Sequence, residues 1–263
     1  MARYQLLYEK VRHFEGLDLV EPEPVGTGDL LRAHQADYVR RALDGELDKM
    51  EQRRLGFPWS EQLVQRSLRS VGATVAGAFW AWDHKAVAVN LAGGTHHAFA
   101  DRGEGFCLFN DCVVAARCWQ EQAGRARQVV FIDCDVHQGN GTASICAGDD
   151  SLFTMSLHGR LNYPFHKEIS DLDLELSDGC QDEEYLQRLQ EGLARLPEAD
   201  LAFYLAGADP YEKDRLGRLK LTREGLRQRD RMVLDWCRHA GTPVPSRRHP
   251  GGGDYGRRLC RAH

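Results

Sequence analysis

The chain has 263 residues, of which 42% are hydrophobic and 28% are charged, and its formal net charge is −5. This is ordinary globular composition, and no apolar run approaches the roughly 20 residues that a membrane span requires. The acidic balance offers no broad basic surface, so we expect no direct binding of nucleic acid.

Short apolar runs alternate along the chain with longer segments of helical periodicity, which is the pattern of βαβ units and a parallel sheet. In chain order we expect helices at 30–43 and 60–80, a strand at 86–91, a helix at 110–122, strands at 129–134 and 152–157, a helix at 183–196, a strand at 201–206 and a helix at 224–238. The expected fold class is α/β, with one domain over 1–244 whose mainly parallel β-sheet has helices on both faces. Residues 245–263 are expected to form an irregular carboxyl-terminal tail, because Arg, His, Pro and Gly stand where a final apolar strand should follow.

The eight cysteines form no CxxC pair, which argues against a disulfide framework and against a thiolate zinc site. The amino terminus, MARYQLLYEK, lacks the succession of basic, apolar and small residues that marks a secretory signal. We therefore expect reduced thiols and a cytoplasmic protein.

The stretch VVFIDCDVHQGNGT runs from a buried strand into Asp133, Asp135 and His137. Residues two apart in a strand share a face, so these side chains can project together from the carboxyl end of the sheet. In open α/β sheets that edge is where ligands bind. Another predicted strand leads into Asp209 at the same edge.

Carboxylates that converge at one buried edge call for a cation. Asp135, His137 and Asp209 would supply two carboxylate oxygens and one imidazole nitrogen, leaving coordination positions open for water and substrate. Zinc is the leading metal, and ferrous iron is the alternative that suits the same ligands. The competing interpretation of the DxDxH pattern is a set of surface charges or a capping turn.

His96 and His97 follow the pair Gly93-Gly94, which permits the turn that two adjacent histidines need in order to serve one site. Such a pair is suited to acid/base chemistry near neutral pH. The alternative is two loop histidines, one of them a cap. In the catalytic interpretation, Asp133 fixes the tautomer of His96, and Asn140 is a neutral counterpart for His97.

Two loop segments carry aromatic residues. GEGFCLFND places Phe106 after glycine, and GRLNYPFHKE places Tyr163 and Phe165 around a proline. Loop aromatics usually pack, but beside a metal site they could form the walls of a narrow channel for an extended side chain.

Five stretches together resemble the histone deacetylase family, especially its bacterial members and the class IV branch. In the family's order they are AGGTHHAFADRGEGFCLFND, IDCDVHQGNGTA, FTMSLHG, NYPFHKEISDLDLELSDG and YLAGADPYEKDRLGRL. The resemblance covers about 91–221 and implies the arginase/deacetylase fold, truncated here at both ends. It also implies removal of an acetyl or longer acyl group from lysine side chains or from a small acylated amine.

The resemblance also assigns site residues by position. It implies that Zn²⁺, with Fe²⁺ as the alternative, is held by Asp135, His137 and Asp209. It implies catalytic roles for His96, His97, Asp133 and Asn140, and substrate-binding roles for Gly105, Phe106 and Tyr163. A structural K⁺ is implied on backbone oxygens of Asp133, Asp135, His137, Ser156 and Leu157.

The tail departs from the family's pattern. Where the family has an apolar strand ending in Gly-Gly-Tyr, with a tyrosine that hydrogen-bonds the developing oxyanion, this chain has HPGGGDYG. Asp254 separates the glycines from Tyr255, which is the candidate for the oxyanion donor.

Three interpretations of function remain at this point. The first is a metal-dependent amidohydrolase that uses metal-activated water and tandem-histidine acid/base catalysis. The second is a non-catalytic or fragmentary metal-binding remnant that lacks the catalytic tyrosine. The third is another metal hydrolase of the same broad fold, such as a ureohydrolase, which requires two metals and more bridging carboxylates than the sequence offers. The sequence does not determine the oligomeric state.

Overall fold

A four-stranded parallel sheet lies at the centre of residues 2–239, the part of the chain that the computed structural model describes. The strands are β1 (Val129–Asp133), β2 (Leu152–Gly159), β3 (Leu172–Leu176) and β4 (Leu201–Leu205), in the spatial order β3-β2-β1-β4. Every pairing is parallel, so all four carboxyl ends meet at one edge. The predicted tail, 245–263, and Tyr255 within it lie outside the described residues.

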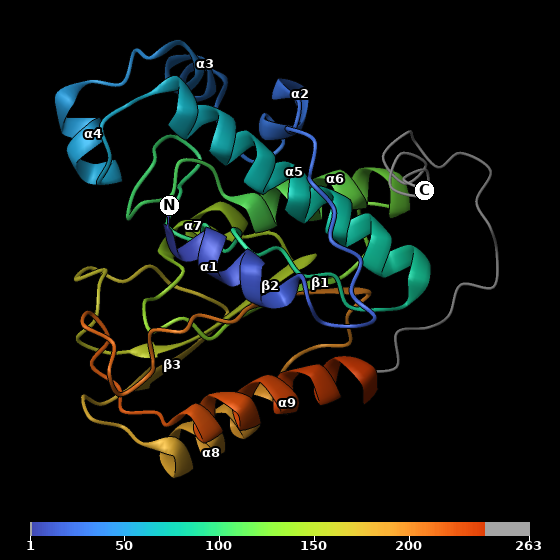
Figure 1. Cartoon of the computed structure of the whole chain (residues 1–263), viewed down its shortest axis with the longest axis vertical. Helices are drawn as coiled ribbons and strands as arrows, with labels where there is room; N and C mark the ends of the chain where they lie inside the picture. The colour runs from blue at the N-terminus through green and yellow to red at the C-terminus, as the bar shows by residue number, and fades with distance from the viewer. Residues whose placement is uncertain (1, 240–263) are drawn as a thin grey trace.

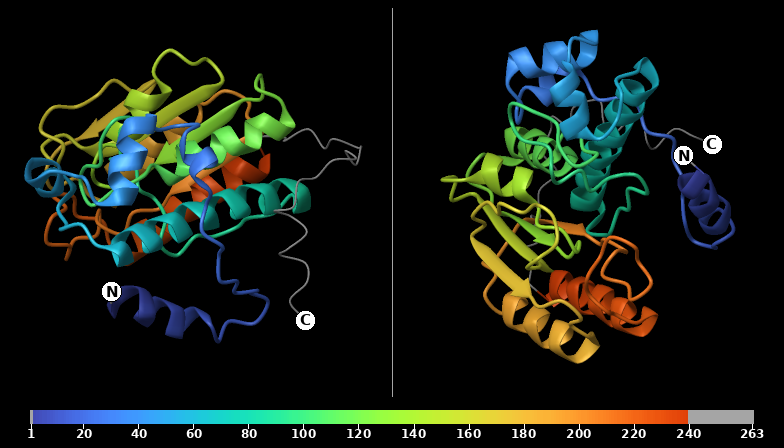
Figure 2. Two further views of the ribbon diagram at one scale, coloured as in Figure 1. Left: turned by 90° about the horizontal axis from the view of Figure 1, so that it is seen from above. Right: turned by 90° about the vertical axis from the view of Figure 1, so that its left-hand side faces the viewer.

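Helices cover both faces of the sheet, as Figure 1 and the right-hand view of Figure 2 show. The helices α5 (Glu61–His84) and α6 (Asp111–Ala123) lie on one face, and α8 (Asp182–Leu193) and α9 (Arg223–His239) lie on the other. Successive residues of β1 alternate between the two cores: Val129 and Phe131 pack on the first side, Val130 and Ile132 on the second. Burial on both faces is why this strand is a continuous apolar run.

The remaining helices are short or lie at the amino-terminal end. They are α1 (Ala2–Val11), α2 (Thr27–Leu30), α3 (Ala36–Asp44), α4 (Lys49–Leu55) and α7 (Asn140–Cys146). Figure 2 shows α1 standing away from the sheet, and its Leu6 and Tyr8 are exposed. No helix among residues 2–239 combines the length and the apolarity that crossing a membrane would require.

Two predictions of secondary structure were wrong. The segment 86–91 is not a strand: no described strand pairs with it, and its Val87 and Val89 are exposed. Instead Asn90 ties it to α5 by donating to the carbonyl oxygen of Ser70 and to the Thr74 hydroxyl. The predicted helix at 30–43 is two helices, α2 and α3, because the chain turns between them and the Gln35 N–H donates to the carbonyl oxygen of Ala100.

His34, in the turn between α2 and α3, connects the amino-terminal helices to the loop before α6. Its Nδ1–H donates to the carbonyl oxygen of Phe99 at 2.9 Å, and its Nε2 accepts from the backbone N–H of Asn110 at 2.9 Å. If Nε2 were protonated, its N–H would face the N–H of Asn110, so two donors would meet without an acceptor. Burial, at 4% exposure, lowers the pKa of His34 to about 4, so the ring is neutral in the folded protein.

We expect acid to destabilise the fold through His34. Its native pKa of about 4 lies below the ordinary value of 6.5, so between these pH values the unfolded chain binds the proton more readily. The contribution, up to about 3 kcal/mol, is present above roughly pH 6.5 and is lost as the pH falls toward 4. Urea unfolding of wild type and His34→Gln at pH 7 and about pH 4.5 measures this, because glutamine donates and accepts without titrating. The stability advantage of wild type should shrink in acid, and an advantage independent of pH would contradict the assignment.

Candidate metal centre and active site

Three predicted ligands meet at the carboxyl edge of the sheet. Asp135 and His137 follow the end of β1, and Asp209 follows the end of β4, which pairs with β1 in parallel. Nδ1 of His137 lies 2.9 Å from Oδ1 of Asp135 and 3.1 Å from Oδ2 of Asp209. The three ligand atoms lie within 4.8 Å of one another, so residues 74 positions apart in the sequence form one compact cluster.

The cluster has the chemistry and the size of a site for one divalent ion. Two carboxylate oxygens and one imidazole nitrogen suit zinc or ferrous iron, and ligands at about 2 Å from an ion lie roughly 3–3.5 Å apart. Burial alone would lower the pKa of His137, but hydrogen bonds to Asp135 and Asp209 raise it to about 10. A proton on this ring balances the two carboxylates, and a divalent ion would replace that proton.

Backbone groups hold the ligand carboxylates in place. Oδ1 of Asp209 accepts from the Val136 N–H at 3.0 Å, which joins the segment after β4 to the segment after β1. Gly207 lies against Asp135 so closely that a Cβ there would be 2.5 Å from the Asp135 carboxylate. A side chain at 207 would therefore displace the carboxylate of Asp135, a predicted ligand, which explains the glycine in YLAGADP.

The tandem histidines lie beside this cluster and are both 5% exposed. Nδ1–H of His96 donates to Asp133 at 2.6 Å, and Nδ1–H of His97 donates to Oδ1 of Asn140 at 2.7 Å. The two rings are 4.1 Å apart, and His97 lies 6.0 Å from the His137 ring. The geometry thus brings together the four residues predicted to be catalytic that lie in the described chain.

Their partners tune the two rings in opposite directions. Burial lowers the pKa of His96, but the charge of Asp133, its hydrogen bond to the ring and the charge of Asp135 together outweigh burial and raise the pKa to about 9. Burial and the positive charge of His96 together hold the pKa of His97 well below its ordinary value, because its partner Asn140 is neutral. Titratable neighbours with separated pKa values are the usual arrangement for distinct acid/base roles.

Asp111, the first residue of α6, holds the turn that precedes the histidines. One carboxylate oxygen accepts from the N–H and the hydroxyl of Thr95, at 2.8 and 2.7 Å. The other accepts from the Gly94 N–H at 3.1 Å and from the Thr74 hydroxyl at 2.6 Å. Asp111 is 1% exposed and was not predicted.

The predicted substrate-binding residues lie on the outer side of His97. The Tyr163 ring stands edge-on to His97, with centroids 5.0 Å apart and planes at 85°. Gly105 has φ +54° and lies against His97 from another direction, since a Cβ there would be 2.5 Å from the ring. Phe106 follows it at the surface, 57% exposed, where its ring contacts Phe57.

Glu104 also belongs to this group and was not predicted. Its carboxylate accepts a short hydrogen bond from the Tyr163 hydroxyl and a longer one, 3.4 Å, from the Asn140 amide. Burial and the Glu104 charge raise the pKa of Tyr163, so the phenol remains a donor. The motif GEGF contains Glu104, but nothing in the motif indicates a partner that lies 59 positions away in the sequence, as Tyr163 does.

The residues predicted to hold a monovalent cation lie where β1 and β2 end. Asp133 and Ser156 are register partners in this pair of strands, and Leu157 follows in β2. Asp135 and His137 continue the chain beyond β1. Their backbones are neighbours at one edge.

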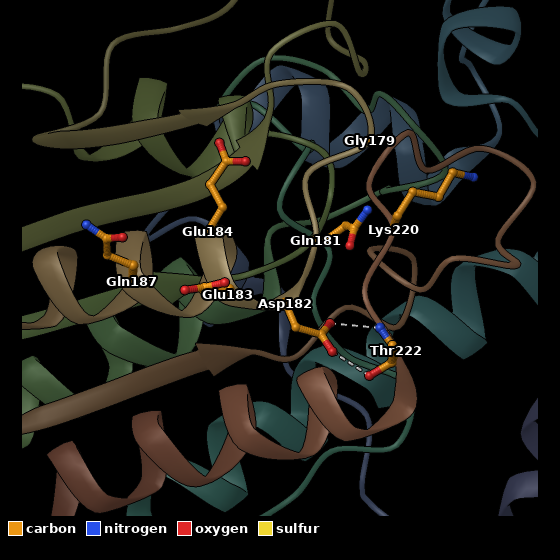
Figure 3. Close-up of a pocket in the computed structure, with 8 residues that line it drawn as sticks. All are labelled: Gly179, Gln181, Asp182, Glu183, Glu184, Gln187, Lys220 and Thr222. Atoms are coloured by element: carbon orange, nitrogen blue, oxygen red, sulfur yellow. Dashed lines mark hydrogen bonds between the residues drawn. The ribbon is translucent and has the colours of Figure 1, made fainter.

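A groove of about 610 Å³ lies elsewhere, at the amino-terminal end of α8, and Figure 3 shows the side chains that line it. Asp182 there accepts from the N–H and the hydroxyl of Thr222, so its carboxylate serves the connection into α9. None of the predicted site residues lines this groove.

Comparison with known proteins shows similarity to one family over most of the chain. The histone deacetylase domain matches residues 1–256. An uncharacterized protein of Picosynechococcus sp. is 47% identical over 214 residues, which cover 80% of this chain and 71% of that protein. Histone deacetylase 2 of Arabidopsis thaliana is 30% identical, with 86% of this chain and 61% of the relative covered. Acetoin utilization protein AcuC of Bacillus subtilis is 28% identical, with 84% and 63% covered, so the chain spans under two thirds of these two relatives.

A solved structure shares the fold. The crystal structure of an HDAC homolog from Aquifex aeolicus superimposes with a TM-score of 0.77 at 24% identity, covering 89% of this chain and 69% of the other. The four described strands and their flanking helices therefore have the same α/β fold as this solved structure.

Proposed function

Because the chain belongs to the histone deacetylase family, a family of hydrolytic deacetylases, we propose that it hydrolyses the amide bond of an acylated amine at the cluster of Asp135, His137 and Asp209. The substrate class is an acylated lysine side chain in a peptide or a small acylated amine. The observation that carries the proposal is the oppositely tuned histidine pair, His96 and His97, beside a set of ligands for one ion.

We infer that one divalent ion is held by the two carboxylates and Nδ1 of His137, zinc in the first place and ferrous iron as the alternative. When bound, such an ion acts as a Lewis acid toward a carbonyl oxygen and lowers the pKa of water. A single ion with three protein ligands favours a deacylase over a two-metal hydrolase such as a ureohydrolase. A structural K⁺ at the ends of β1 and β2 is part of the same proposal.

His97 is the proposed base and acid. Its Nδ1–H is committed to Asn140, which leaves Nε2 as the nitrogen that takes a proton from the attacking water. Its low pKa keeps it neutral, and therefore able to accept, at the pH where carboxylates are ionised. After attack, Nε2–H returns the proton to the leaving amine. Tyr255 stays the proposed oxyanion donor, outside the described residues.

His96 has a different proposed role. Its hydrogen bond to Asp133 keeps it protonated, so it places a fixed positive charge beside the reacting carbonyl rather than exchanging a proton. Burial of both rings excludes bulk water from the path of the proton.

Phe106 and Tyr163 are the proposed walls for the alkyl part of the substrate. Glu104 holds Tyr163 by a hydrogen bond, and Gly105 lets the protein backbone pass close to His97. An extended alkyl group of the substrate that enters between Phe106 and Tyr163 would therefore reach His97. Apolar walls with few polar groups suit the methylene chain of lysine or of a small amine.

Tyr163→Phe should weaken substrate binding without stopping the chemistry. The ring remains, but the hydrogen bond to Glu104 is lost, and a loss of about 1 kcal/mol corresponds to a rise in KM of about fivefold. Values of kcat should stay within roughly twofold of wild type. Steady-state kinetics on an acetyl-lysine peptide measure both, together with Glu104→Ala and the double variant. If the hydrogen bond holds the wall, the double variant should be no worse than Glu104→Ala alone; fully additive losses would contradict the coupling.

The proposed function is tested by loading the purified protein with Zn²⁺ or, without oxygen, Fe²⁺, and assaying a fluorogenic acetyl-lysine peptide and a panel of acylated amines. Metal-dependent amide hydrolysis is the expected result. A folded protein with one bound ion and no hydrolysis of any acylated amine would instead favour the metal-binding remnant.

A further inference from the structure

Arg229 of α9 is a buried cation whose guanidinium reaches the segments that carry the proposed ligands. Its side chain is nearly inaccessible, with 2% of the residue exposed, although neighbours such as Arg227 and Arg231 on the same helix are exposed. Leaving a buried guanidinium without partners would be costly, so its contacts indicate its role.

One guanidinium nitrogen bridges two segments. Nη1 donates to the carbonyl oxygen of Gly207 at 2.6 Å and to that of Cys134 at 3.3 Å. Cys134 directly precedes Asp135, and Gly207 lies two residues before Asp209. We call residues 134–137 and 206–209 the ligand segments; Arg229 is hydrogen-bonded to both.

The other side of the guanidinium is fixed as well. Nε and Nη2 donate to Oδ1 of Asp230 at 2.9 and 2.8 Å, and the same oxygen accepts from the Tyr204 hydroxyl at 2.6 Å. Because Asp230 balances the charge, the pair presents little net charge to a nearby metal ion. Its effect on the ligand segments is therefore geometric more than electrostatic.

We propose that Arg229 is a positioning residue that clamps the two ligand segments together and so sets the affinity of the site for its divalent ion. The proposal rests on the proposed metal site. Without the clamp, Asp135 and Asp209 are still present, but the carbonyl oxygen of Gly207 loses its donor and that of Cys134 keeps only the Tyr185 hydroxyl at 3.5 Å. The two segments are then joined less firmly, mainly by the Val136 N–H that donates to Asp209. Ligands that must be brought together bind an ion more weakly than ligands already in place.

Arg229→Lys distinguishes the effect of the guanidinium's hydrogen bonds from the effect of its positive charge. Lysine keeps a buried cation beside Asp230, but its side chain is one bond shorter and its ammonium cannot reproduce the fork that spans Asp230 and both carbonyls. Arg229→Met removes the donors altogether. The matched control is Arg231→Lys, the same change two residues along the helix on its exposed side.

Two measurements decide the proposal. Competition with a chromophoric chelator gives the Kd for Zn²⁺, which should rise by about 10- to 100-fold in Arg229→Lys and Arg229→Met and stay unchanged in Arg231→Lys. Hydrogen exchange of the metal-free protein should show faster amide exchange in both ligand segments, with slow exchange preserved in β2.

Circular dichroism shows whether each variant is folded, and if Arg229→Met is not, Arg229→Lys still decides. Wild-type affinity and wild-type exchange in a folded Arg229→Lys would overturn the clamp. A wild-type protein that binds no ion would contradict the proposed metal site instead, and the exchange rates would then decide the clamp alone.

Discussion

Asp135→Ala should leave the protein folded but without stoichiometric divalent metal and without measurable amide hydrolysis. Asp135 supplies one of the three proposed ligand atoms, and structural zinc sites with four ligands bind with about 10–16 kcal/mol, so one ligand contributes roughly 3 kcal/mol or more. That is a weakening of at least about 100-fold. Asp209→Ala should behave in the same way, since its oxygen lies equally close to His137.

The fold itself should tolerate the change, because the negative charge of Asp135 raises the pKa values of two neighbouring carboxylates, Asp133 and Asp209. Removing it relieves this repulsion. Metal content by atomic emission and the rise in Tm on adding Zn²⁺ measure the effect, because an ion that binds only the folded state stabilises it. Asp171→Asn is a suitable control, as its carboxylate accepts from Thr154 in β2, away from the ligands. Retention of one tightly held ion by either alanine variant would remove that residue from the ligand set.

His97→Ala should bind the ion as wild type does and lose about 10²- to 10⁴-fold in kcat, the range that positioned acid/base groups contribute. His97 is not in the ligand cluster, and its hydrogen-bond partner is the neutral Asn140. The fall in kcat is therefore expected to reflect lost proton transfer and not lost metal binding. Metal content, Kd for Zn²⁺ and kcat on the acetyl-lysine peptide separate the two effects.

His96→Ala provides the comparison for His97→Ala. It removes a charge paired with Asp133 rather than the proposed base, so its loss in kcat should be smaller. If His96→Ala abolished turnover while His97→Ala remained active, the roles assigned to the two rings would have to be exchanged.

The strands that could be predicted are those in which apolar residues predominate. The first four residues of β1, VVFI, form a continuous apolar run, and all five residues of the strand are buried. β3 was missed because acidic residues alternate with its leucines: Leu172, Leu174 and Leu176 are buried, while Asp173 and Glu175 between them are more exposed. The opposite error, a strand at 86–91, arose because an apolar run becomes a strand only when another strand pairs with it.

The site was predictable where chemistry follows directly from a strand end. Asp133, Asp135 and His137 are spaced by two after β1, and parallel strands bring Asp209 to the same edge, so the cluster follows from topology. Asp133 is the last residue of β1, so it lies at the same edge of the sheet, where it is the hydrogen-bond partner of His96.

The supporting residues could not be predicted in the same way. Arg229 meets the carbonyl oxygen of Cys134 across 95 positions of sequence, and Glu104 meets Tyr163 across 59. Such contacts depend on how helices and loops pack over the sheet edge, and neither arginine nor glutamate has a local pattern that distinguishes a buried partner from a surface charge. Asp111 was hidden for the same reason.

The most direct measurement is a titration of metal-stripped wild type with Zn²⁺, following hydrolysis of the acetyl-lysine peptide and of small acylated amines alongside bound metal. Activity should rise in proportion to bound zinc and reach its limit at one ion per chain, and in Asp135→Ala it should not rise. Saturation of one ion per chain with no hydrolysis, or activity that appears only with a second ion, would contradict a one-metal deacylase.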